Sequence, residues 1–143
     1  MGSACQVSFD VAPAPPRALR VLAVDDAPMN LELMAAMLEA VGYELDFAAN
    51  GAEAVEMAQA RDYDLILMDL QMPVMDGATA TRRIRASDGP NTATPILAVT
   101  GSTQPQQVDA CREAGMDDHI AKPVGVQDLI VKAAQWTGRR RVA

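Results

Sequence analysis

The sequence has few aromatic residues, only two cysteines and a single histidine. Aromatic residues make up 3% of the 143 positions, whereas 50% of the chain is hydrophobic, so aliphatic and methionine side chains must fill the core. That amount of apolar material can form a real core in a chain of this length, which fits one domain. Cys5 and Cys111 lie far apart without metal-ligand spacing, and we therefore expect reduced thiols in a cytoplasmic protein.

Clustered basic residues and long apolar runs are also missing. The formal net charge is -7, and the only basic cluster, Arg139 to Arg141, lies in residues 138–143, which we interpret as a solvated basic tail. A nucleic-acid surface needs clustered Lys and Arg, so we expect no nucleic-acid partner. No apolar run approaches the roughly 18 residues of a membrane span, and no basic region precedes an apolar stretch near residue 1, so we expect neither membrane contact nor a signal peptide.

Residues 1–18 have a different pattern from the rest of the chain. Apolar and polar residues alternate from Cys5 to Val11, which is typical of a half-buried strand, and the segment APAPP then predicts an extended linker. We interpret 1–18 as a leader and linker whose strand ends a preceding domain. A disordered or artificial leader is the alternative.

From Leu19 onward, short apolar runs alternate five times with segments of helical periodicity. Strands are predicted over 19–24, 44–49, 65–68, 95–100 and 118–122, and helices over 28–41, 51–60, 78–87, 105–115 and 126–136. The alternation predicts an α/β fold over residues 19–137, a doubly wound five-stranded parallel sheet with helices on both faces. We assume the strand order 2-1-3-4-5 from this fold class, because periodicity does not determine it.

Polar side chains stand at the carboxyl ends of four predicted strands, where ligands bind in such sheets. Asp25 and Asp26 follow the first strand, Asp69 follows the third, Thr100 ends the fourth and Lys122 ends the fifth. In the assumed order three carboxylates share one crevice, where they repel one another unless a cation is present, and few hard oxygen ligands favour Mg²⁺. With a lysine and a hydroxyl added, the set predicts a site for a tetrahedral dianion. A carboxylate oxygen of Asp69 would be the nucleophile that becomes phosphorylated.

The segments around these tips resemble the receiver domain of two-component response regulators. They are DD (25–26), MDLQMPVMDG (68–77), VTG (99–101) and AKP (121–123), and the resemblance extends from about Leu19 to Trp136. It implies a flavodoxin-like (βα)₅ fold that takes a phosphoryl group from a phosphohistidine onto Asp69 with Mg²⁺, or alternatively Mn²⁺. The implied partner is a histidine kinase or a histidine phosphotransfer protein.

The resemblance also implies the ligands of the metal. Asp26 would bind Mg²⁺ directly and Asp25 largely through water. Asp69 and the backbone carbonyl of Gln71 would complete the protein ligands. Taken singly, Asp25 or Asp26 has an alternative interpretation as the N-cap of the helix that follows.

The remaining site residues follow from the same resemblance. Thr100 would donate a hydrogen bond to the phosphoryl group, and Lys122 would pair with one of its oxygens. A cis Lys122-Pro123 bond would aim the lysine into the crevice. Gly77 is expected to supply a backbone shape that other residues resist.

Two positions depart from the family pattern. Gly101 stands where family members usually have Ala, which predicts a looser loop. His119 stands where an aromatic switch residue is usual, and it is either a titratable switch or an ordinary surface histidine. Because it is the only histidine, no phosphohistidine relay is possible within this chain.

Several origins and activities fit this pattern. Residues 1–18 weakly resemble the last strand of the ATP-binding domain of histidine kinases, which favours the C-terminal receiver of a hybrid histidine kinase over a stand-alone single-domain regulator. Such a domain promotes its own phosphorylation and dephosphorylation without being a turnover enzyme, although the parent chain would be a kinase. A phosphatase of the haloacid-dehalogenase type also uses an aspartate after a strand, but it needs a second aspartate where this chain has Gln71.

The resemblance also implies that a phosphohistidine-carrying partner docks on the helix after the first strand, from Met29 to Ala40. Its apolar residues Met29, Leu33 and Met37 include candidates for that contact, but we expect any single one of them to pack in the core. Trp136 is likewise expected to be packed.

Overall fold

The structure is a computed structural model that describes residues 19–70, 72, 74–101 and 105–142, and for residues 139–142 the backbone alone. Five strands form one parallel sheet in the order β2-β1-β3-β4-β5, which confirms the predicted fold. The strands are β1 (Arg20–Val24), β2 (Glu44–Ala48), β3 (Leu65–Asp69), β4 (Ile96–Thr100) and β5 (Asp118–Ala121). The helices are α1 (Pro28–Glu39), α2 (Gly51–Ala60), α3 (Gly77–Ala86), α4 (Pro105–Ala114) and α5 (Val126–Val142). The strand and linker predicted within residues 1–18 lie outside the described residues.

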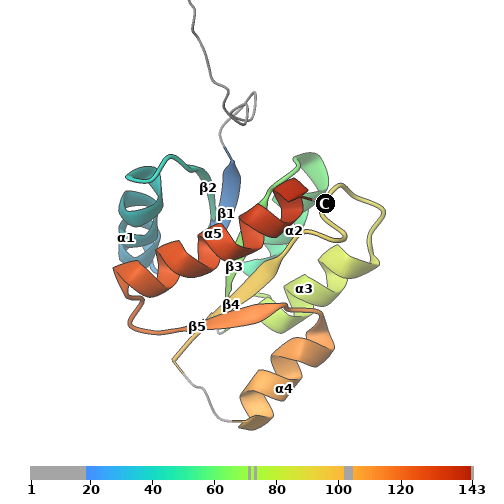
Figure 1. The fold of residues 1–143 in the computed structure, drawn as a ribbon. Helices are drawn as coiled ribbons and strands as arrows, with labels where there is room; N and C mark the ends of the chain where they lie inside the picture. Colours follow the sequence, from blue (N-terminus) through green and yellow to red (C-terminus); the bar gives the residue numbers. More distant parts are fainter. Residues whose placement is uncertain (1–18, 71, 73, 102–104, 143) are drawn as a thin grey trace, which may run out of the picture.

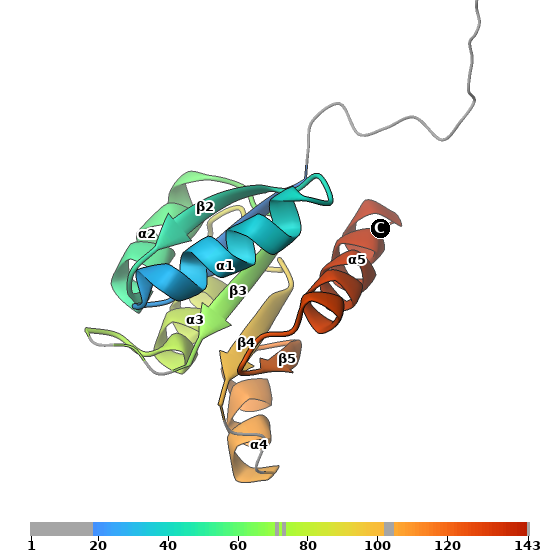
Figure 2. The same ribbon diagram turned by 90° about the vertical axis from the view of Figure 1, so that its left-hand side faces the viewer.

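The helices cover both faces of the sheet, because side chains alternate along each buried strand (Figure 1). Val21 and Ala23 of β1 face one core, which α1 and α5 close with Met34, Leu38, Leu129 and Ala133. Leu22 and Val24 face the other core, which α2, α3 and α4 close with Ala54, Ala58, Ala80, Ile84 and Cys111. Figure 2 shows α5 on one side of the sheet and α2 and α3 on the other. All five residues of β3 and of β4 are buried, so these central strands are a rigid base for whatever follows them.

The last helix is longer than the sequence predicted. We expected it to end at Trp136, before a solvated tail, but α5 continues to Val142. Gly138 is the poorest helix former in the added segment, and arginine both favours helix and complements the negative end of the helix dipole. The basic residues of 138–142 therefore extend a helix. No helix in the described part of the chain is both long and apolar enough to cross a membrane.

Local signals fix the starts of the helices. Asn50 caps α2 by accepting a hydrogen bond from the Glu53 N–H (2.9 Å), and the Glu53 carboxylate accepts one from the Ala49 N–H (2.9 Å), which together form a capping box. Helix α1 begins at Pro28 after Ala27, which has no side-chain cap. The N-cap interpretation of the aspartates after β1 is therefore wrong.

Asp118 at the start of β5 fixes α5 against the sheet. Its carboxylate accepts hydrogen bonds from Lys132 Nζ (2.9 Å) and from Trp136 Nε1 (3.1 Å). Burial raises the pKa of Asp118, but these donors, the His119 N–H and the charge of Lys132 outweigh it, and the pKa lies below the ordinary carboxyl value. The indole of Trp136 is therefore packed, as expected, and also holds a specific polar contact.

A second polar anchor, Asn91, lies in the loop before β4, on the α2 side of the sheet and not on the α5 side. Its side chain is 1% exposed and makes four hydrogen bonds. Its Oδ1 accepts from the Tyr63 N–H (2.8 Å) and the Thr94 hydroxyl (2.9 Å), while its Nδ2 donates to the carbonyls of Ala58 (2.5 Å) and Arg61 (2.6 Å). One buried amide thus connects the end of α2, the approach to β3 and the approach to β4.

Candidate functional site

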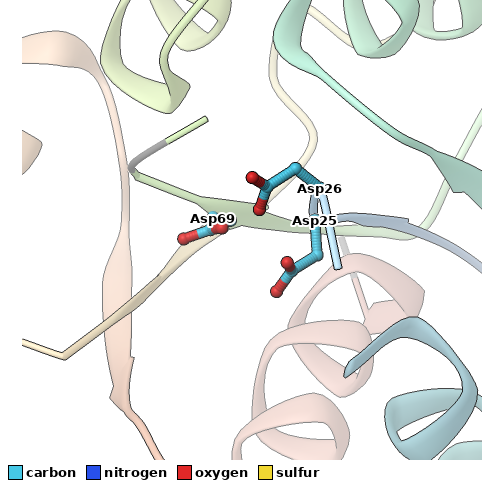
Figure 3. Close-up of side chains that lie close together, drawn as sticks. All are labelled: Asp25, Asp26 and Asp69. Atoms are coloured by element: carbon cyan, nitrogen blue, oxygen red, sulfur yellow. The ribbon is translucent and has the colours of Figure 1, made fainter. Parts of the chain in front are cut away.

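Three carboxylates meet at the carboxyl ends of β1 and β3. Val24 pairs with Met68 in the sheet, so the chain delivers Asp25 and Asp69 side by side, with Asp26 next to them. Ligand oxygens of Asp25, Asp26 and Asp69 lie within 4.8 Å of one another, and Figure 3 shows the three side chains together. Asp25 is 1% exposed and Asp69 3%, whereas Asp26 faces solvent. Buried carboxylates this close repel one another strongly unless positive charge lies between them.

Lys122 supplies part of that charge from the loop after β5. Its Nζ lies 3.1 Å from Asp69 Oδ1 and 3.5 Å from Asp25 Oδ2. Burial lowers the pKa of Lys122, but the hydrogen bond to Asp69 and the charges of both aspartates outweigh it, so the pKa lies above the ordinary value and the ammonium is charged at neutral pH. The Lys122-Pro123 peptide bond is cis, as expected. The Lys122 N–H also donates to the Thr100 carbonyl (2.8 Å), which joins the lysine to the end of β4.

The four charged groups line an open pocket of about 300 Å³ together with Ala27, Asn30 and Gly101. Thr100 is buried at the tip of the adjacent strand β4. A cluster of carboxylate oxygens with one side open to water suits Mg²⁺, which takes one or two carboxylates and keeps several waters. The residues present therefore fit this cation. Gln71, whose carbonyl was expected to complete the ligands, lies outside the described residues.

The structure shows why position 77 needs a glycine, and the reason differs from the expected one. Gly77 is the first residue of α3 and does not have a positive φ, so the prediction of a special backbone shape was wrong. A Cβ at this position would instead collide with the Asp69 carbonyl oxygen and come within 2.9 Å of Met68 Cγ. The glycine lets α3 start directly against the backbone of the strand that carries Asp69.

Asn30 is part of the pocket and was not identified from the sequence. Its Nδ2 donates a hydrogen bond to Asp25 Oδ2 (3.2 Å), and the Ala27 N–H donates one to Asp25 Oδ1 (2.9 Å). Asn30 is the third residue of α1, and its position near the end of β1 is the only sequence signal that indicates the contact.

The family model of the response regulator receiver domain matches residues 21–134. The chain belongs to this family. The receiver domain is 40% identical over 128 residues to the sensor protein GacS of Pseudomonas syringae pv. syringae, a match that covers 88% of this chain but only 14% of that protein. It is 45% identical over 122 residues to the two-component response regulator ORR41 of Oryza sativa subsp. japonica, covering 82% of this chain and 94% of that one.

A solved structure has the same fold. The receiver domain of the sensor histidine kinase PA1611 from Pseudomonas aeruginosa PAO1 matches with a TM-score of 0.78 at 38% identity, covering 85% of this chain and 98% of that chain. That structure has a magnesium ion coordinated in its active-site cleft. The present chain is therefore a receiver domain of two-component systems, similar both to receivers within histidine kinases and to a response regulator.

His119 of the receiver domain lies away from the acidic pocket. It is on β5, and its side chain is 35% exposed with Nδ1 3.9 Å from Asp118 Oδ1. It lines a separate pocket of about 130 Å³ with Val108, Cys111 and Arg112 of α4. His119 does not line the pocket of Asp25, Asp26 and Asp69, and its switching role stays a prediction.

Helix α1 of the receiver domain presents apolar side chains to solvent beside the acidic pocket. Met29 is 79% exposed and Leu33 51%, so the expectation of core packing was wrong for both, whereas Met37 is partly buried against the core. Leu33 also lines a cavity of about 380 Å³ with Met34, Val99, Pro123 and Val124, which adjoins Asp25, Asn30 and Lys122. An exposed apolar face next to a polar site is typical of a surface that another protein covers.

Proposed function

We propose that this receiver domain accepts a phosphoryl group from a phosphohistidine onto Asp69, with Mg²⁺ held by Asp25, Asp26, Asp69 and the Gln71 carbonyl. One observation carries the proposal: three carboxylates have ligand oxygens within 4.8 Å of one another and one lysine pairs with two of them. Mn²⁺, which favours the same oxygen ligands, is an alternative cation. The domain promotes its own phosphorylation and dephosphorylation, without turnover of a separate substrate.

The chemistry needs little more than position and charge. A carboxylate oxygen of Asp69 forms a bond to phosphorus as the bond from phosphorus to the histidine nitrogen breaks, and the electron pair of that bond goes to the imidazole. The bound cation supplies charge neutralisation for the phosphoryl oxygens. Lys122 keeps its positive charge throughout and pairs with a phosphoryl oxygen, while the Thr100 hydroxyl donates a hydrogen bond to another. Because the Asp69 carboxylate is buried and held by Lys122, its nucleophilic oxygens are oriented before the donor arrives.

Thr100 and His119 have proposed roles in signalling that the phosphoryl group is bound. When Thr100 moves toward the phosphoryl group it vacates space, and the His119 side chain on the neighbouring strand β5 would turn inward into that space. Gly77 and Pro123 have supporting roles, because they fix the backbone that carries Asp69 and Lys122.

The proposed partner is a histidine kinase or a histidine phosphotransfer protein. The exposed residues Met29 and Leu33 of α1, together with the adjoining apolar cavity, support a docking surface for a helix that carries the phosphohistidine. The long kinase relatives, of which this chain matches a small part, support an origin in a hybrid histidine kinase, where the domain would lie in the cytoplasm. A stand-alone regulator such as the rice relative is the alternative.

Labelling with acetyl phosphate tests the proposal. We expect the purified chain to gain one acid-stable, base-labile phosphoryl group in the presence of Mg²⁺ and none in the presence of a chelator, measured by intact mass spectrometry. Asp69→Asn should abolish the label, whereas Asp88→Asn, an exposed aspartate in the loop after α3, should retain it. A wild-type chain that never becomes labelled would refute the proposal, and steady turnover of a phosphomonoester would favour a phosphatase instead.

A further inference from the structure

The carboxylate of Asp25 is held by more than its ion pair. Asp25 Oδ1 accepts from the Ala27 N–H (2.9 Å), and Asp25 Oδ2 accepts from Asn30 Nδ2 (3.2 Å). These two donors are uncharged: Ala27 is the N-cap residue of α1, and Asn30 lies in its first turn. A carboxylate that is 1% exposed needs such donors, because burial removes the water that would otherwise solvate it.

Lys122 is a shared partner and a less secure one for Asp25. Its Nζ lies closer to Asp69 Oδ1 (3.1 Å) than to Asp25 Oδ2 (3.5 Å), and under the proposed function it turns to the phosphoryl group. The Asn30 amide has no such competing task among the contacts of the described residues. Its backbone N–H donates to the Ala27 carbonyl (3.0 Å), so its main chain is fixed within the first turn of α1.

We propose that Asn30 is a positioning residue that holds the Asp25 carboxylate in the orientation in which it supports the bound divalent cation. This inference rests on the proposed function and adds a residue to its metal site. An amide suits the task because it donates a hydrogen bond without neutralising charge, so Asp25 keeps its full attraction for the cation. An outer hydrogen-bond partner of this kind fixes the orientation of the ligand and thereby tunes metal affinity.

The position of Asn30 also explains why a polar side chain is needed there. Asn30 lines both the acidic pocket and the neighbouring apolar cavity that contains Leu33 and Met34. An apolar side chain at this position would extend the apolar cavity up to Asp25 Oδ2 and leave that oxygen with the shared lysine alone. An aspartate would place a further carboxylate in a cluster that already repels itself.

Asn30→Leu tests the inference, because leucine has a similar size and no hydrogen-bond donor. We expect Mg²⁺ to bind the unphosphorylated variant roughly 10-fold more weakly than the wild type in isothermal titration calorimetry, as is usual when such a partner is lost. The labelling rate with acetyl phosphate should need correspondingly more Mg²⁺ for half-saturation but approach the wild-type rate at saturating Mg²⁺. Glu32→Leu is the matched control on the exposed side of the same helix turn, and its Mg²⁺ affinity should equal that of the wild type.

An Asn30→Leu protein whose Mg²⁺ affinity stays within two-fold of the wild type would overturn the inference, as would an equal loss in Glu32→Leu. If Asn30→Leu does not fold, Asn30→Ser gives the same test, because its hydroxyl is too short to reach Asp25 and the same weakening is expected. Failure of the inference is distinguishable from failure of the proposed function. If the wild type binds Mg²⁺ and is labelled but the variant behaves identically, Asn30 alone was misassigned. If the wild type does neither, the proposed function and the inference are both wrong.

Discussion

Replacing Gly77 with alanine tests the packing between α3 and the strand that carries Asp69. The added Cβ would collide with the Asp69 carbonyl oxygen, which belongs to the backbone of a fully buried strand and cannot rotate away as a flexible side chain does. Helix α3 must then shift, at the expense of the hydrogen bond from the Gly77 N–H to the Leu70 carbonyl (3.0 Å). Overpacking of this kind costs about 3 kcal/mol at its upper range. The better helix propensity of alanine returns up to about 1 kcal/mol, and a net loss of about 2 kcal/mol is expected.

Urea denaturation followed by the fluorescence of Trp136, the only tryptophan, measures this loss. A loss of about 2 kcal/mol lowers the midpoint by roughly 1 M urea at an ordinary slope for a domain of this size. Gly138→Ala is the matched control, because Gly138 also lies within a helix but a Cβ there meets nothing within 4 Å. That variant should be stabilised by about 0.5 to 1 kcal/mol. Equal effects of the two substitutions would refute the steric argument, and labelling of Asp69 should fall only in Gly77→Ala.

Three further outcomes follow from the described contacts. Asn91→Ala leaves the buried Tyr63 N–H and two carbonyls without their partner, so we expect a loss of about 3 kcal/mol in urea denaturation, and a loss below 1 kcal/mol would contradict this role. Val74 has a φ of 73° and is 82% exposed, so Val74→Asn should raise the free energy of unfolding by about 1 kcal/mol; an unchanged or lower value would show that the loop is not strained. The pKa of Asp118 is depressed in the folded protein, so its stabilisation is complete above the ordinary carboxyl pKa and is lost as pH falls through the lower folded value. Asp118→Asn should therefore flatten the acid side of the stability profile below about pH 4, and an unchanged slope would argue against the contact with Lys132.

The sequence predicted a parallel sheet and the residues at its strand tips, whereas the strand order was assumed from the fold class. Short apolar runs separated by helical segments determine a parallel sheet, and once the order 2-1-3-4-5 holds, residues after β1, β3 and β5 must meet at one edge. Asp25, Asp26, Asp69 and Lys122 are adjacent for that reason. The family pattern supplied the cis bond before Pro123, which periodicity alone does not contain.

What the sequence did not reveal depends on distances across the fold. Asparagine is ordinarily a surface residue, so the sequence does not single out Asn30 or Asn91. Their importance comes from the partners that the folded chain brings within hydrogen-bond reach. Gly77 was singled out for its backbone freedom, whereas the actual reason, the approach of another segment, requires the position of β3. The exposure of Met29 could not be read from helical periodicity, because α1 carries apolar residues on nearly every side.

Strand β3 contributes alternate side chains to both cores and ends in Asp69, so the two helical layers share one mechanical support. The backbone of Asp69 touches the start of α3 through the space that Gly77 leaves, and the next residue, Leu70, donates its N–H to the Val99 carbonyl of β4 (3.3 Å). A displacement of the Asp69 backbone would therefore press directly on the start of α3. A small chemical change at Asp69 would therefore shift the helices on both faces of the sheet together as rigid bodies. Proteins bound to either face would respond to the same change.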